Sequence, residues 1–224
     1  MQKSLRALVW DLPTRLFHWL LAILILLQYG TAEWRWLDMQ WHVRFGYATL
    51  TLVLFRIAWG FAGSQTARFA DFVRGPRRVF VYVRELVAGH APFSVGHNPL
   101  GGWSVLAMLA CLLLQAVTGL FASNRRHTEF GPWALHVPER WSQGLTTIHK
   151  INQDVLLVLI ALHIAVVLAY WISRNENLIG PMLHGRKDPA PVAPLRFVRL
   201  RRALIALAIA AFIVLAVVGA GSLA

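Results

Sequence analysis

Cysteine and charge are both scarce in this 224-residue sequence. The single cysteine, Cys111, lies in the middle of an apolar run, where it is interpreted as a small hydrophobic side chain. One cysteine excludes an intrachain disulfide, covalent haem attachment through a CxxCH motif, and an iron–sulfur cluster held by cysteines. Charged residues make up only 14% of the chain, whereas soluble domains usually carry about a quarter. This composition is unusual for a protein surrounded by water.

Hydrophobic residues make up 57% of the chain and gather in five runs. A bilayer-spanning helix needs roughly 20 such residues, and unpaired backbone amides are too costly in hydrocarbon for other structures to cross. The fold class predicted is therefore an all-α integral membrane protein with five helices. The first run is short, and the fourth is expected to extend back to about Thr146. The runs are Leu16 to Ala32, Val43 to Gly63, Gly102 to Ala122, Val155 to Ser173 and Ala203 to Leu223.

The first run has an alternative interpretation as the apolar part of a cleaved signal peptide. It follows basic residues and ends near small ones, as such signals do. The tail before it is long, however, and contains Trp10, Asp11 and Pro13. We therefore expect the first run to be a membrane span.

Basic residues outnumber acidic ones by 22 to 10, and the net charge is +12. Fifteen of them lie in the N-terminal tail, the connection 64–101 and the segment before the last run, whereas six lie in the other connections. This positive-inside pattern predicts a cytoplasmic N-terminus and a C-terminus on the outer side. The charge is thus explained by topology and lipid headgroups, and we expect no nucleic acid as a partner. Residues 69–86 are expected to form an amphipathic helix along the membrane surface.

Histidine is the residue type that carries the functional prediction. An ionisable group inside a membrane span is costly, so it is expected to face the protein interior. Four of the nine histidines lie in or at the ends of predicted spans, namely His18, His42, His149 and His163. The other five lie in predicted loops and are expected to be solvated or interfacial, namely His90, His97, His127, His136 and His184.

The four histidines in the spans are predicted to form two pairs. His149 and His163 are 14 residues apart, which places them on nearly the same helix face and about 21 Å apart along its axis. One metal ion cannot bind both, so each needs a partner from another span. The alternating direction of the spans pairs His42 with His149 near the outer surface and His18 with His163 nearer the cytoplasm. Residue counting places His163 deeper than His18, so helix tilt or a shifted helix start must absorb the difference.

Two stacked imidazole pairs inside a helix bundle suit haem. Bundles hold cofactors between facing helices, and two axial histidines fill both open positions of a haem iron, which favours electron transfer over oxygen chemistry. Zinc or copper would need further ligands, and no carboxylate or thiol lies at these depths. Gly46 and Ala22 would let a flat ring approach the backbone. The alternative is four histidines that form hydrogen bonds between helices without a cofactor.

Basic residues at similar depths suit the two propionates of haem, because guanidinium groups bind carboxylates through paired hydrogen bonds. Arg44 and Lys150 are the candidates for the outer haem. Arg15 and Arg56 are the candidates for the inner haem. Since Arg56 lies inside the second span, its alternative role is to reach the cytoplasmic surface with its long side chain.

The opening VWDLPTRLFHWLLA resembles the start of the bacterial cytochrome b561 proteins, which are similar to the cytochrome b subunits of nickel–iron hydrogenases. WHVRFGYATLTLVLFRIAWGF resembles the second helix of that family. The strings FVRGPR, GHNPLGGW, IHKINQDVLLVLIALHI and ENLIGPMLHGRK resemble later segments in order. The likeness covers about residues 8 to 187. We therefore expect a cytochrome b561-like domain at 1–187, a cytoplasmic linker rich in Pro and Arg at 188–202, and an additional transmembrane helix at 203–224.

The resemblance implies a four-helix transmembrane bundle with two haem b groups, whose ligands fall on His18, His42, His149 and His163. It implies electron exchange across the bacterial cytoplasmic (inner) membrane between quinone and a periplasmic or membrane redox protein, either cytochrome c-like or hydrogenase-like. The predicted function is a di-haem electron relay, with quinone near the inner haem beside Arg15, His18 and Trp19. Whether the chain is itself an enzyme stays open.

Two other functions stay open as well. Some relatives pass electrons from superoxide to quinone, and Arg44, Lys150, Arg125 and Arg126 would form an outer rim that attracts anions. The third function is a non-enzymatic membrane-anchor subunit or haem carrier of a redox complex. This third function predicts labile haem or one haem per chain.

Overall fold

The computed structural model of the chain describes residues 7–90, 92, 94–124, 129–188 and 194–223. Five of its helices are long and apolar enough to cross a membrane. They are α1 (Leu12–Glu33), α2 (Met39–Ala62), α5 (Pro99–Phe121), α6 (Glu139–Arg174) and α8 (Leu200–Leu223). The predicted fold class, an all-α protein with five apolar helices, is confirmed.

The helix ends follow local sequence signals. The side chain of Asp11 accepts a hydrogen bond from the backbone N–H of Thr14 at 2.9 Å, and the proline in the first turn of α1 has no N–H that would need an acceptor. Asn98 caps α5 in the same way, through a 2.7 Å bond from the N–H of Gly101. Helix α6 ends where Asn175 takes a left-handed conformation with φ of 53°.

Helix α6 begins at Glu139, seven residues before the expected start at Thr146. The additional turns carry polar side chains that bond to the end of α5 and the chain beyond it. Ser142 donates to the carbonyl of Phe121 at 2.8 Å, and the hydroxyl of Thr146 accepts from the N–H of Ser123 at 3.0 Å. The polar turns are therefore stabilised by neighbouring protein, which a hydropathy pattern cannot reveal.

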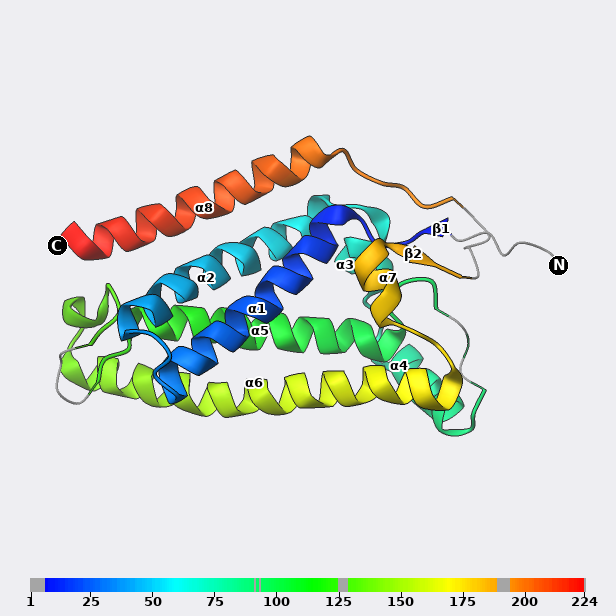
Figure 1. Cartoon of the computed structure of the whole chain (residues 1–224), viewed down its shortest axis with the longest axis horizontal. Helices are drawn as coiled ribbons and strands as arrows, with labels where there is room; N and C mark the ends of the chain where they lie inside the picture. The colour runs from blue at the N-terminus through cyan, green and yellow to red at the C-terminus, as the bar shows by residue number, and fades with distance from the viewer. Residues whose placement is uncertain (1–6, 91, 93, 125–128, 189–193, 224) are drawn as a thin grey trace.

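The long helices form a bundle in which α1, α5 and α8 run opposite to α2 and α6 (Figure 1). Helix α1 packs on α2, helix α5 packs on α6, and α2 joins the two pairs by packing on α5. Helices α1 and α6 do not pack closely against each other. Helix α8 lies outside the bundle along α2, where Ala203, Ala210 and Val214 are buried.

Short elements gather at the end of the bundle where α1 begins (Figure 1). We call this the inner end and the opposite one the outer end, after the sides predicted from the basic residues. The expected surface helix over residues 69–86 is divided at Gly75 into two helices. A helix and a strand lie between α6 and the expected linker at 188–202, and residues 189–193 of that linker lie outside the described part. The short elements are β1 (Ala7–Leu8), η1 (Gln65–Ala67), α3 (Phe69–Phe72), α4 (Pro76–Val87), α7 (Ile179–His184) and β2 (Arg186–Lys187); η2 (Ala134–His136) lies at the outer end.

Candidate functional site

The outer pair consists of His42 on α2 and His149 on α6, whose ring centroids are 6.4 Å apart. The Nδ1 atom of His42 lies 3.0 Å from the carbonyl oxygen of Gln28, and Nδ1 of His149 lies 2.9 Å from the carbonyl oxygen of Gln115. A carbonyl only accepts, so each Nδ1 carries the hydrogen and donates it. The Nε2 lone pair of both rings is therefore free to bind a metal ion.

Two threonines support the outer pair in matching positions. The hydroxyl of Thr31 donates to the carbonyl of Leu27 at 2.8 Å and lies 3.4 Å from Nδ1 of His42. The hydroxyl of Thr118 donates to the carbonyl of Leu114 at 2.7 Å and lies 3.2 Å from Nδ1 of His149. Each histidine is thus oriented by the helix next to its own, α1 for α2 and α5 for α6.

The inner pair consists of His18 on α1 and His163 on α6, with ring centroids 6.3 Å apart. The Nδ1 atom of His18 is buried without a hydrogen-bond partner. Within the described residues, His163 likewise shows no hydrogen bond at either ring nitrogen. Trp19 contacts the His18 ring edge to face, at 5.0 Å between centroids. The inner rings are therefore positioned by packing alone.

The spacing of both pairs fits a single iron between two imidazoles. With metal–nitrogen bonds of about 2 Å on opposite sides of one ion, the two ring centroids would lie roughly 6 Å apart. No group of three or more His, Cys, Asp or Glu able to hold a metal occurs among the described residues. The remaining ligands would thus come from a macrocycle such as the porphyrin of haem. Beside His42, a Cβ added at Gly46 would meet only the side-chain oxygen of Gln28, at 3.9 Å, so this face of α2 is open.

Arg56 and Arg15 both lie at the inner end, as predicted. The Arg56 side chain is only 2% exposed, and its Nη1 has no hydrogen-bond partner. Its guanidinium carbon lies 5.3 Å from the ring centroid of Phe69 and 5.9 Å from that of Phe72. The alternative that Arg56 reaches the membrane surface is therefore wrong. Arg15 donates from Nη1 to the carbonyl of Leu183 at 2.5 Å, while its Nε is buried without a partner.

Arg44 and Lys150, the predicted outer cations, both have exposed side chains. The guanidinium of Arg44 lies over the ring of Trp41, 4.9 Å from its centroid, and not against a histidine. Arg125 and Arg126, which are expected to join them in an outer rim that attracts anions, lie outside the described residues. The role of Arg44 and Lys150 toward the propionates stays a prediction.

His97 is the residue that the sequence interpretation missed. It was expected to be solvated, but its ring lies between Trp10, at 4.8 Å between centroids, and Phe72, at 4.5 Å. Its Nδ1 is shielded from solvent and has no partner. Burial lowers the pKa of His97 to about 3, and the charge of Arg56 adds to the shift, so its imidazole is neutral at pH 7. The sequence carries no local signal for this burial, because Trp10 and Phe72 are distant from His97 along the chain.

The inner end is built from segments far apart in the sequence. Asp11 accepts a 3.0 Å hydrogen bond from Nε1 of Trp59, and Thr66 donates to the carbonyl of Val9 at 2.6 Å. Nε1 of Trp19 donates to the carbonyl of Met182 at 3.1 Å, so α7 is held against α1. Strands β1 and β2 pair antiparallel and tie the N-terminal tail to the chain after α7. The N-terminal tail, the chain after α2 and the chain after α6 therefore meet at the inner end of the bundle.

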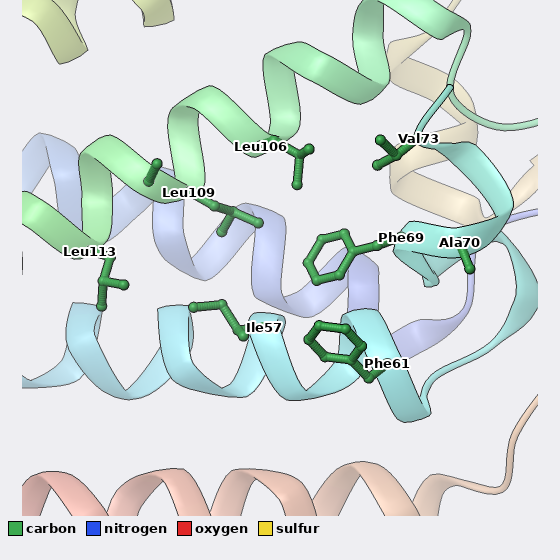
Figure 2. Close-up of a pocket in the computed structure, with 9 residues that line it drawn as sticks. Ile57, Phe61, Phe69, Ala70, Val73, Leu106, Leu109 and Leu113 are labelled. Atoms are coloured by element: carbon green, nitrogen blue, oxygen red, sulfur yellow. The ribbon is translucent and has the colours of Figure 1, made fainter. Parts of the chain in front are cut away.

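An apolar groove of about 560 Å³ opens between α2, α3 and α5 (Figure 2). No histidine and no charged residue lines it, so it is separate from both histidine pairs. Phe69 lines the groove and also lies against Arg56, which makes its ring a wall between the two. The groove can accept an apolar chain but offers no charged or hydrogen-bonding side chain to orient a redox group. It is lined by Ile57, Phe61, Phe69, Ala70, Val73, Leu106, Leu109, Ala110 and Leu113.

Comparison with known proteins agrees with this arrangement. A family model described as prokaryotic cytochrome b561 matches residues 9–185. The chain is also 26% identical, over 214 aligned residues, to a probable Ni/Fe-hydrogenase B-type cytochrome subunit of Rhizobium leguminosarum bv. viciae. That alignment covers 80% of this chain and 87% of the relative. Helix α8 lies beyond the family match.

Proposed function

The chain belongs to the prokaryotic cytochrome b561 family and is a multi-pass membrane b-type cytochrome of electron transfer; on this premise we propose that it is a di-haem relay. The relay connects quinone in the bacterial inner membrane with a redox protein at the outer end of the bundle. The proposal rests on the two imidazole pairs. Their ring centroids are 6.3 and 6.4 Å apart, a spacing that fits one iron between the two rings of each pair.

The four histidines are the residues proposed to bind the cofactor. His18 and His163 would hold one haem, and His42 and His149 would hold the other, the latter two through Nε2 because their Nδ1 atoms donate to backbone carbonyls. Haem b supplies one-electron chemistry at its iron when bound. Two histidines would hold each haem from the protein side, which would leave no place for a substrate at the metal and would favour electron transfer. The apolar bundle keeps water away and thereby favours a fixed low-spin ligation.

The basic residues supply the remaining recognition of the cofactor. Arg15 and Arg56 serve the inner haem, and the unpartnered Nε of Arg15 and Nη1 of Arg56 support this assignment. Arg44 and Lys150 serve the outer haem from exposed positions. A guanidinium bound to a carboxylate neutralises charge inside the bundle, which lowers the cost of burying both groups.

Quinone exchanges electrons at the inner end, next to His18, Arg15 and Trp19. Trp19 supports this location because its ring contacts His18 and is itself exposed toward the surroundings of the bundle. The outer partner is a periplasmic or membrane redox protein, and the hydrogenase-type relative favours a hydrogenase-like one. With the basic residues inside, the N-terminus is cytoplasmic and the C-terminus periplasmic.

Reduction of the purified protein by quinol tests the proposal. Stopped-flow spectroscopy of the detergent-solubilised or nanodisc-embedded chain should show quinol-driven reduction of both haems. A protein with two haems that no ubiquinol, menaquinol or analogue reduces would contradict the quinone assignment. Trp19→Ala should slow the reaction while the haem content stays at the wild-type value.

Superoxide oxidation is the second candidate function, and the exposed cations at the outer end favour it. Arg35, Arg44 and Lys150 all present exposed side chains there, and such a surface attracts anions. Stopped-flow mixing with superoxide separates the two functions. Rapid reduction of the outer haem that slows in Arg44→Gln would support the oxidase, whereas no reaction would leave the relay alone. A non-enzymatic anchor or carrier instead predicts one haem or labile haem.

A further inference from the structure

Arg56 is a buried cation without a counterion in the described structure. It forms no ion pair or hydrogen bond there, and its Nη1 is orphaned. Asp11 acts on it electrostatically, but both oxygens of that carboxylate are engaged by Thr14 and Trp59. The faces of Phe69 and Phe72 compensate only part of the lost hydration. Burial of a guanidinium with so little compensation is costly, and an anion bound at Nη1 would lower that cost.

His97 supplies a second orphaned polar atom next to Arg56. The two side chains are close enough for the Arg56 charge to act on the imidazole. Phe72 contacts both of them, and it holds the His97 ring from the side opposite Trp10. The neutral imidazole has one N–H to donate. A guanidinium and an imidazole N–H that share the Phe72 ring as a neighbour form a donor set that suits a carboxylate.

The position of this donor set relates it to the inner histidine pair. His18 and His163 both act electrostatically on His97, which places the loop histidine at the same end of the bundle as the inner pair. The apolar groove lies on the other side of Phe69 and gives Arg56 no partner. An anion that reaches Arg56 from the inner pair therefore belongs to the group that the pair holds.

We propose that Arg56 and His97 together bind one propionate carboxylate of the inner haem, with Phe72 as the ring that positions both. This inference rests on the proposed function, and it adds a fifth histidine to the cofactor site. The alternative occupant is a quinone head that enters through the groove. A quinone is uncharged and would leave the buried guanidinium without a counterion, so the carboxylate is the better partner.

Exchange of haem against excess apomyoglobin tests the inference in a His42→Ala background, where only the inner site is expected to hold haem. Arg56→Gln should release haem roughly 10- to 100-fold faster, because charged hydrogen bonds are lost. His97→Phe keeps an aromatic ring between Trp10 and Phe72 and should release haem about tenfold faster. Arg140→Gln, which alters an exposed arginine at the outer end with no role assigned to it, is the control and should leave the inner rate unchanged.

Haem b dimethyl ester, in which both propionates are neutral, identifies the group that is bound. Reconstituted into the background protein, the ester should dissociate as fast as haem b does from Arg56→Gln. The Arg56→Gln and His97→Phe substitutions should then add little to the ester's rate, because the shared interaction is already absent. Full effects of both substitutions on the ester would overturn the inference.

Three further outcomes separate the possible failures. If Arg56→Gln does not fold, Arg56→Lys takes its place. This variant should retain haem b but hold the dimethyl ester as weakly as the unsubstituted background does. Equal retention of haem b and the ester by Arg56→Lys would overturn the inference. Unchanged haem retention with slower quinol reduction in the wild-type background would assign Arg56 and His97 to quinone. A wild-type chain without haem would remove the proposed function itself, whereas two haems with unaffected variants would remove only this inference.

Discussion

The two histidine pairs have nearly the same spacing but are held in different ways. In the outer pair, both Nδ1 atoms donate to backbone carbonyls of neighbouring helices, with Thr31 and Thr118 beside them. In the inner pair, Nδ1 of His18 is orphaned, and His163 shows no bond at its ring among the described residues. Regular helices therefore fix the outer ligands before any cofactor binds, whereas the inner site depends on what it binds.

The two pairs also differ in the elements and the cations that surround them. The outer pair lies between long helices, and its cations Arg44 and Lys150 are exposed. The inner pair lies at the end of the bundle where short elements from the N-terminal tail, the α2–α5 connection and the chain after α6 gather, and its cation Arg56 is buried. A ligand oriented by a second hydrogen bond is more basic and more rigid. The comparison therefore predicts two haems with different properties in one bundle.

Loss of an axial ligand is the change with the largest expected effect. His18→Ala and His163→Ala should each remove the inner haem and leave the outer one, whereas His42→Ala and His149→Ala should do the reverse. Pyridine haemochrome analysis should then give one haem per chain in every case. His90→Ala, which alters an exposed loop histidine, is the control and should retain two. If His163→Ala and His42→Ala removed the same haem, the pairing would be wrong.

The midpoint potentials of the two haems should differ by at least about 60 mV, a tenfold change in the one-electron equilibrium constant. The outer potential is expected to be the lower one, because carbonyl-bound Nδ1–H groups make His42 and His149 stronger donors to ferric iron. At the inner end, the Arg56 cation disfavours the additional positive charge of the ferric state and raises the potential. Redox titration of the wild type, assigned with the single-histidine variants, measures both values. An outer haem with the higher potential would contradict this comparison.

The threonines beside the outer histidines should have a smaller effect. Thr118→Val keeps the shape of the side chain but removes the hydroxyl next to Nδ1 of His149. Outer haem should dissociate up to about tenfold faster, while the inner haem stays unaffected. Thr51→Val is the matched control, because the Thr51 hydroxyl makes the same kind of intrahelical bond, to Tyr47 at 2.9 Å, on α2. Equal effects of the two substitutions would mean that the hydroxyl acts on the helix and not on the ligand.

Removal of α8 should have the smallest effect on the haems. A chain that ends at Arg199 loses the packing on α2 and the 2.9 Å bond from Nε1 of Trp133 to the carbonyl of Val217. Neither loss touches a histidine of the two pairs, so two haems with wild-type absorption spectra are expected. Thermal stability should fall, since the van der Waals packing of α8 on α2 and the bond to Trp133 are lost. Disappearance of either haem would assign α8 to the cofactor site.

The sequence predicts the long helices and the two pairs because both depend on local patterns. Hydropathy identifies each span, and the spacing of His149 and His163 places them on one helix face. The start of α6 is missed because Ser142 and Thr146 are polar and find their partners only in the folded chain. The environment of His97 is missed for the same reason, since its neighbours Trp10 and Phe72 are distant in sequence.

The number of haems per chain tests the central claim most directly. Purified full-length protein, with its concentration fixed by quantitative amino-acid analysis, is assayed by pyridine haemochrome and by low-temperature electron paramagnetic resonance. The account predicts two haem b per chain, both low-spin, with two distinct resonance signals. A chain that binds no haem, or one that binds a single haem unaffected by either His18→Ala or His42→Ala, would contradict it.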